Sequence, residues 1–226
     1  MIQRIQTKIR RELFKTLTKI LKNNYKVIST KSLIKSPNAL NSKQGEFTDY
    51  IRITTLQLCA YEINEKNING DVAELGVYKG EFAKKINKEF SNRRLFLFDT
   101  FEGFDKLTEH EDICKYGARG HDFSDTTQEQ VIKKMPFPKK CVIKAGLFER
   151  TCKEIENDFF CFVSIDVDLF KPTYEGLKFF YPRLHTGGYI FVHDYNNKDW
   201  PGVKEAVNTF CKEQEISFVP IPDTHG

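Results

Sequence analysis

The sequence of 226 residues has 35 basic and 31 acidic side chains, a formal net charge of +4, and 40% hydrophobic residues. This length accommodates one large α/β domain or two small ones. No window approaches 18 consecutive apolar residues, so we expect no membrane-spanning helix. Residues 1–24 lack an uninterrupted apolar run and a small-residue cleavage site, so we expect no secretory signal.

The basic excess is concentrated in residues 1–31, which contain nine basic residues and one acid, Glu12. The rest of the chain has 26 basic and 30 acidic residues. Apolar residues recur in 1–31 at three- and four-residue steps, which predicts a basic amphipathic helical arm. The arm packs in a homo-oligomer, covers its own domain or contacts anionic lipid at a membrane surface, and we favour packing. Nucleic acid is not an expected partner, because the folded part is mildly acidic.

Six cysteines lie far apart and form no C-x-x-C pair. A zinc ribbon needs closely spaced thiolates, so the spacing favours buried free thiols in a reducing, cytoplasmic environment. Residues 32–70 contain a polar linker with Pro37 and Gly45, followed by a helical lid over 49–66. The predicted parts are therefore the arm (1–31), the linker and lid helix (32–70) and the remaining domain (71–226).

From Asp71 onward, short apolar runs alternate with helical stretches. The predicted strands are 71–77, 94–100, 141–146, 159–167, 188–194 and 216–221, and the predicted helices are 79–90, 126–135, 171–184 and 201–214. Near-continuous apolar strands separated by helices are typical of a parallel sheet covered on both faces. The predicted fold class is therefore α/β, with a doubly wound, mostly parallel sheet.

Ligands of such sheets bind beyond the carboxyl ends of the strands. The first predicted strand leads into residues 74–80 (ELGVYKG), where Glu74 precedes a glycine turn that differs from a dinucleotide or P-loop motif. The second ends at Asp99, which suits either ribose hydroxyls or a turn cap. Asp166 and Asp168 end the fourth strand, and His193 and Asp194 end the fifth. Three acids and an imidazole predict a site for Mg²⁺, Mn²⁺ or Fe²⁺.

At these residues the chain resembles the macrocin O-methyltransferase family, whose members use S-adenosylmethionine to methylate sugar hydroxyls. The resemblance covers about 45–222 and rests on the order and spacing of eight stretches, which are 74–80, 98–104, 122–126, 144–148, 165–173, 181–188, 193–195 and 200–202. It implies the class I methyltransferase fold and a divalent cation, usually Mg²⁺. It also implies a cofactor site, assigned here to Glu74, Gly76, Tyr78, Gly80, Asp99, Thr100, Asp122, Gly146 and Leu147.

The resemblance implies that Asp166 and the pair His193-Asp194 bind the cation and that Asp166 is the general base. The family usually has Asp-Asp-Tyr where this chain has His193-Asp194-Tyr195. An imidazole shifts preference toward Mn²⁺, Fe²⁺ or Zn²⁺, and His193 is an alternative base. The fold normally closes with a seventh, antiparallel strand, whereas this sequence stops after the predicted sixth. Either that strand is cut from the sequence, or the sixth strand occupies its slot.

The predicted reaction is transfer of a methyl group from S-adenosylmethionine to a hydroxyl of a sugar or glycosylated acceptor. Basic and aromatic residues of the lid and of loop 101–125 either line a pocket for a glycosyl or phosphorylated acceptor or are solvated loop residues; they are Tyr50, Arg52, His110, Arg119 and His121. Two other functional classes stay open: a metal-dependent hydrolase, and a non-catalytic cofactor-binding module that acts through the basic arm.

Overall fold

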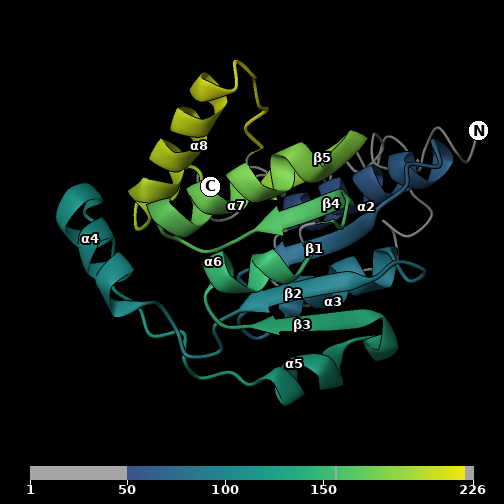
Figure 1. The fold of residues 1–226 in the computed structure, drawn as a ribbon, viewed down its shortest axis with the longest axis horizontal. Coiled ribbons are helices and arrows are strands. Elements are labelled where there is room, and N and C mark those ends of the chain that lie inside the picture. Colours follow the sequence, from purple (N-terminus) through teal and green to yellow (C-terminus); the bar gives the residue numbers. More distant parts are fainter. Residues whose placement is uncertain (1–49, 156, 222–226) are drawn as a thin grey trace, which may run out of the picture. The chain divides into compact units, whose positions relative to one another are not determined.

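The computed structural model describes residues 50–155 and 157–221, which belong to a compact unit spanning Asn41–Gly226 (Figure 1). The predicted arm and the predicted polar linker lie outside the described residues. Within the described part of the chain, no helix combines the length and hydropathy that crossing a bilayer requires.

Five parallel strands form the sheet, in the order β3-β2-β1-β4-β5. They are β1 (Asp71–Leu75), β2 (Leu95–Asp99), β3 (Cys141–Ala145), β4 (Phe160–Ile165) and β5 (Leu184–Val192). β2 and β4 are apolar runs that are buried on both faces of the sheet, as a parallel sheet between helices requires. The strand order reverses direction between β1 and β4, which confirms the predicted doubly wound architecture.

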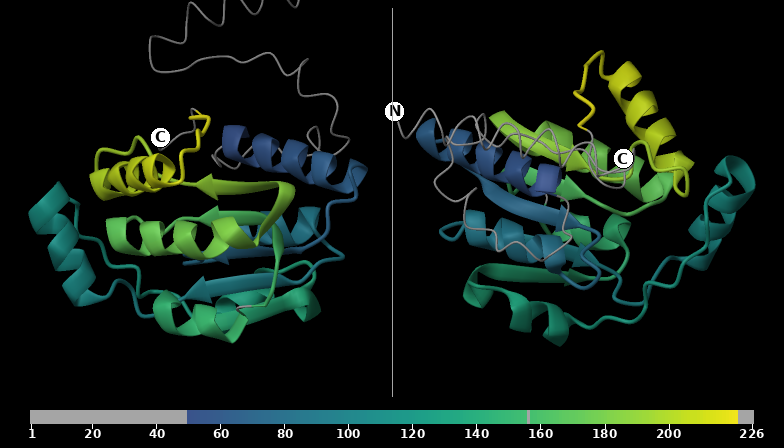
Figure 2. Two further views of the ribbon diagram at one scale, coloured as in Figure 1. Left: turned by 45° about the horizontal axis from the view of Figure 1, so that its top comes forward. Right: turned by 180° about the vertical axis from the view of Figure 1, so that it is seen from behind.

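Helices cover both faces of the sheet (Figures 1 and 2). One face carries α2 (Tyr50–Glu65), α3 (Glu81–Glu89) and α5 (Gln128–Lys134). The other face carries α6 (Phe148–Thr151), α7 (Phe170–Phe180) and α8 (Pro201–Glu213). Helix α4 (Lys106–Tyr116) stands beyond the carboxyl ends of the strands, toward which the arrowheads point in Figure 1. Three 3₁₀ turns complete these connections: η2 (Pro138–Lys140), η3 (Cys152–Ile155) and η4 (Tyr181–Arg183).

The two faces enclose separate hydrophobic cores. In the first, Leu56 and Ile63 of α2 pack with Ile86 of α3 and Phe162 of β4, and all four are fully buried. The predicted lid helix is therefore part of the core of this unit. The second core is aromatic: the rings of Phe160 and Phe180 meet edge to face with centroids 5.1 Å apart. Burying each such ring contributes about 1.5–3 kcal/mol to folding.

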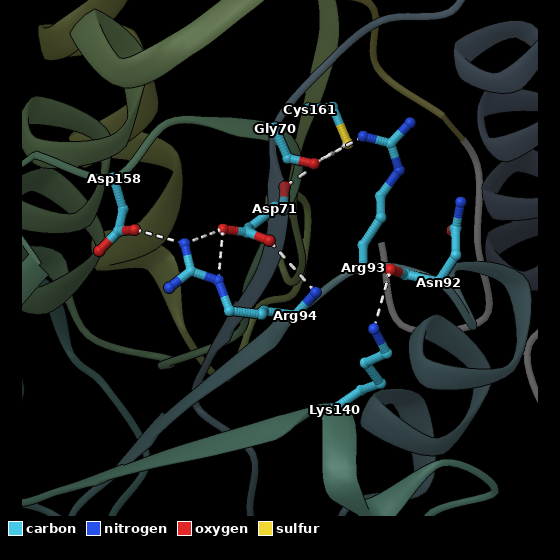
Figure 3. Close-up of polar contacts among 8 residues, drawn as sticks. All are labelled: Gly70, Asp71, Asn92, Arg93, Arg94, Lys140, Asp158 and Cys161. Atoms are coloured by element: carbon cyan, nitrogen blue, oxygen red, sulfur yellow. Dashed lines mark hydrogen bonds and ion pairs between the residues drawn. The ribbon is translucent and has the colours of Figure 1, made fainter.

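Ion pairs fasten the amino ends of the strands, opposite the predicted site (Figure 3). Nε of Arg94 donates to Asp71 at 2.9 Å, and its Nη2 donates to Asp158 at 2.6 Å. The guanidinium of the preceding residue, Arg93, donates to the carbonyl oxygen of Gly70 at 2.6 Å. These contacts join the starts of β1 and β2 to the turn before β4.

The structure corrects the strand predictions near the end of the chain. The predicted strand 216–221 is wrong, because these residues are irregular and no antiparallel strand joins the sheet within the described residues. Pro220 offers no N–H to a strand ladder, and Val219 is 81% exposed. Strand β5 begins at Leu184, four residues before its predicted start. The sequence also gave no indication of α4.

Candidate active site

The strand register brings the predicted site residues to one level. Leu75 of β1 pairs with Ile165 of β4, and Ile165 pairs with Val192 of β5. The residues that follow these three positions therefore leave the sheet side by side, and they include Gly76, Asp166 and His193. A cavity of about 640 Å³ opens at this edge of the sheet.

Seven of the nine predicted cofactor residues line this cavity, together with all three predicted cation ligands. The seven are Glu74, Gly76, Tyr78, Asp99, Thr100, Gly146 and Leu147, and the three are Asp166, His193 and Asp194. Gly80 begins helix α3 and faces α5, where an added Cβ would lie 3.0 Å from Val131. Asp122 lines a separate polar pocket of about 370 Å³ beside α4. The structure thus brings ten of the predicted residues together and leaves Gly80 and Asp122 outside.

Asp99 shapes the glycine turn after β1. Its Oδ2 accepts hydrogen bonds from the backbone N–H groups of Val77 and Tyr78 at 2.7 and 2.8 Å, and its Oδ1 accepts one from Phe101 at 2.7 Å. A carboxylate oxygen has two acceptor sites, so Oδ1 keeps one for a ligand hydroxyl. Both interpretations of Asp99 from the sequence, a turn cap and a ribose acceptor, are compatible with this geometry.

Tyr78 connects this turn to the loop that follows α4. Its hydroxyl donates to Oδ1 of Asp125 at 2.7 Å, and its carbonyl accepts from the hydroxyl of Thr126 at 2.7 Å. Its ring meets Phe123 edge to face, with centroids 5.1 Å apart. Both aromatic rings line the cavity. The turn and the loop therefore form one wall of it.

Asp166, His193 and Asp194 form a compact group at the ends of β4 and β5. One ligand atom from each lies within 4.8 Å of the others. Nδ1 of His193 is 2.6 Å from Oδ2 of Asp194 and 3.1 Å from Oδ1 of Asp166. Asn197 donates to the other oxygen of Asp194 at 2.6 Å and so fixes that carboxylate.

The guanidinium of Arg52, on helix α2, places a positive charge beside this group. Its Nη1 is 3.0 Å from Oδ2 of Asp166. Burial alone would raise the pKa of Asp166, but the charges of Arg52 and His193 outweigh it and hold that pKa well below the usual range. Burial would lower the pKa of His193, yet Asp166 and Asp194 raise it to about 10. Without a bound cation, the imidazole is therefore protonated at neutral pH.

Two further carboxyl groups, those of Glu74 and Asp168, lie in the cavity. Glu74 is 2% exposed, and its Oε2 has no hydrogen-bond partner among the described residues. Burial raises the pKa of Glu74 and, together with the charges of Asp166 and Asp194, that of Asp168. Two carboxylates and one imidazole within bonding reach of a common point are suitable ligands for a divalent cation. The residues present therefore fit the cation that the family resemblance implies.

The predicted acceptor residues lie in different places. Of the four whose side chains the structure describes, only Arg52 lines the cavity, whereas His121 meets Phe123 edge to face with centroids 4.3 Å apart and lines the polar pocket. Arg119 is an exposed partner of Asp199, and His110 is exposed on α4. The side chain of Tyr50 lies outside the described residues. The contact between Arg52 and Asp166 had no signal in the sequence, because it joins a helix to a strand more than a hundred residues away.

Comparison with known families explains this cavity. The model of the family described as Macrocin-O-methyltransferase (TylF) matches residues 41–222, which include every element described above. The chain belongs to this family. It is therefore an O-methyltransferase that uses S-adenosylmethionine, as the sequence predicts. The hydrolase interpretation is not supported by this membership.

Individual relatives of this macrocin O-methyltransferase family member have diverged far in sequence. A mycinamicin III 3''-O-methyltransferase of Micromonospora griseorubida is 26% identical over 180 residues, covering 74% of this chain and 70% of the relative. A demethyldecarbamoylnovobiocin O-methyltransferase of Streptomyces niveus is 22% identical over 178 residues, covering 74% and 67%.

Solved structures confirm the fold. A calicheamicin methyltransferase matches with a TM-score of 0.62 and 20% identity, over 94% of this chain and 88% of that one. The O-methyltransferase NovP matches with a TM-score of 0.61 and 23% identity, over 74% of each chain. The family, rather than these distant structural likenesses, therefore carries the assignment of activity.

Proposed function

We propose that this protein transfers the methyl group of S-adenosylmethionine to a hydroxyl of a sugar or glycosylated acceptor, with a divalent cation in the site. One observation carries the proposal: a single cavity contains seven of the nine predicted cofactor residues and the group of Asp166, His193 and Asp194. The acceptor class is supported by relatives whose names specify mycinamicin and a rhamnosyl tetracenomycin as substrates.

When bound, the donor would supply a sulfonium methyl group, whose sulfur–carbon bond breaks to release a neutral thioether as the carbon–oxygen bond forms, and a divalent cation would make a nearby hydroxyl more acidic. The protein's own residues align the donor and the acceptor, and they take up the proton of the acceptor hydroxyl. Glu74 presents its buried, unpartnered oxygen to the cationic methionine end of the donor. Asp99, Thr100, Gly146 and Leu147 surround the remainder of the donor in our assignment. Asp166 and Asp194 offer carboxylate oxygens to the cation.

The proton from the acceptor hydroxyl passes, in this proposal, to Asp166. Its ionised state at neutral pH supports roles as cation ligand and as base, but its low pKa makes it a weak base. Asp168, two residues further along the chain, also lines the cavity, and its raised pKa makes its ionised carboxylate a stronger base than that of Asp166, so it is a competing proton acceptor when ionised. His193 becomes a third acceptor once it has lost its proton.

The test compares methyl transfer by the wild type and by Asp166→Asn and Asp168→Asn, using S-adenosylmethionine, Mn²⁺ and a panel of glycosides. We expect Asp166→Asn to abolish turnover but to retain donor binding in calorimetry. Asp158→Asn, which changes an aspartate at the opposite end of the strands, is the matched control and keeps full activity. Full activity of Asp166→Asn, or of the wild type in excess chelator, refutes this mechanism.

The same experiment separates the enzyme from a non-catalytic module. Donor binding without methyl transfer to any glycoside favours the module, whereas the absence of donor binding removes both. We further propose that residues 1–31 contribute to a homo-oligomer, and peripheral membrane contact remains the alternative. Ultracentrifugation and liposome flotation with and without residues 1–31 test these two roles, and unchanged behaviour in both refutes them.

A further inference from the structure

We propose that Arg52 is a positioning residue for the cation site: its guanidinium holds one oxygen of Asp166 so that the other stays directed at the cation position. This inference rests on the proposed function. The two carboxylate oxygens of Asp166 have different partners. Oδ2 is 3.0 Å from Nη1 of Arg52, while Oδ1 is 3.1 Å from Nδ1 of His193, within the group of cation ligands.

Two further contacts among the described residues hold the guanidinium. Its Nη2 donates to Oγ of Ser164 at 3.2 Å, and its Cζ lies 3.8 Å from the ring centroid of Phe82. Ser164 is fully buried in β4, and the side chain of Arg52 is only 12% exposed. The planar fork of arginine can contact Asp166 and Ser164 together, which the single ammonium of lysine cannot do in the same geometry.

The helix that carries Arg52 is held in place by its packing. Helix α2 packs against α3 and β5, and its side chains Leu56, Ala60 and Ile63 are buried in the first core. Arg52 lies in the first turn of this helix, so the core of α2 determines where the guanidinium sits. A carboxylate held by such a group cannot rotate freely, and outer contacts of this kind typically change cation affinity by 10–100-fold when removed.

The competing interpretation is that Arg52 and Asp166 form a purely structural ion pair. It predicts the opposite change in cation affinity when Arg52 is removed. Arg52 is a positive charge close to a cation site, so electrostatics alone predicts tighter cation binding when it is removed. Electrostatics alone also predicts no change when lysine replaces arginine. Positioning predicts weaker binding in both variants, because both lose the fork that fixes Asp166.

The experiment measures Mn²⁺ binding to the full chain, by the electron paramagnetic resonance signal of free Mn²⁺, without any turnover. For Arg52→Lys we expect affinity to fall about tenfold or more, and for Arg52→Gln to fall as well. Arg94→Lys is the matched control, since Arg94 also bridges two partners but lies at the opposite end of the strands. Circular dichroism confirms that each variant is folded.

Ser164→Ala is a milder variant that keeps the ion pair and the charge. It removes one anchor of the guanidinium, and we expect a loss of about two- to tenfold in Mn²⁺ affinity. Unchanged affinity in both Arg52→Lys and Ser164→Ala, with the wild type binding Mn²⁺, overturns the positioning role alone. A wild type that binds no Mn²⁺ overturns the cation site of the proposed function and this inference with it.

Discussion

Replacing Gly76 by alanine tests how the turn after β1 is fitted to the end of β4. The backbone at Gly76 has φ +85°, and an added Cβ would lie 1.9 Å from the carbonyl oxygen of Asp166. That oxygen belongs to the backbone, so it cannot rotate away as a side chain can. Either the turn or the end of β4 must move, and both carry residues of the site.

The expected loss in the free energy of unfolding has two parts. A left-handed backbone costs a residue with a Cβ about 1–2 kcal/mol. Forcing an extra methyl group into a packed site costs about 1–3 kcal/mol more. We therefore expect Gly76→Ala to lower the free energy of unfolding by about 2–5 kcal/mol, or about 2–4 °C in Tm for each kcal/mol. Because Asp99 is bonded to the same turn, affinity for S-adenosylmethionine should fall as well.

Gly117→Ala isolates the backbone part. Gly117 ends α4 with φ +76°, and nothing lies within 4 Å of its added Cβ. Both variants change the unfolded chain equally, so the difference between them in urea denaturation is the steric part. Equal stability of the two variants, with unchanged calorimetric affinity for the donor in Gly76→Ala, would show that the contact with Asp166 is not limiting.

Three further predictions concern ionisable groups. Glu74→Gln should stabilise the protein at pH 7 while weakening donor binding. Because the pKa of Glu74 is higher in the folded protein than in the unfolded chain, the wild type loses stability as the pH rises above the pKa of the unfolded chain. The higher free energy of unfolding of the variant must therefore fall back to the wild-type value toward pH 4.5. Mn²⁺ binding at pH 7–8 should release close to one proton from His193, whose pKa is about 10; calorimetry in buffers of different ionisation enthalpy measures this, and no release contradicts imidazole ligation. In native thiol titration, exposed Cys114 should react first, and the two buried thiols, Cys59 and Cys161, last, because burial also raises their pKa values to about 12 and about 11; the reverse order contradicts the assigned burial.

The sequence by itself determined the α/β class, five of the six predicted strands and the end of the sheet that carries the chemistry. Apolar runs such as 95–98 and 160–163 have no polar face, so they can be buried only in the middle of a layered structure. Once such strands are parallel, the residues that follow them meet at one edge. The placement of Asp99, Asp166 and His193 at a common cavity follows from this rule.

The tertiary structure alone decided which neighbours those residues have. Arg52 meets Ser164, 112 residues away, because the packing of α2 against the sheet fixes its direction. Asp122 follows its loop into a second pocket, and 216–221 stays irregular although its composition favours a strand. The local pattern of apolar residues indicates only which face of a segment is apolar. The partner that occupies that face depends on long-range packing, which no local window of the sequence contains.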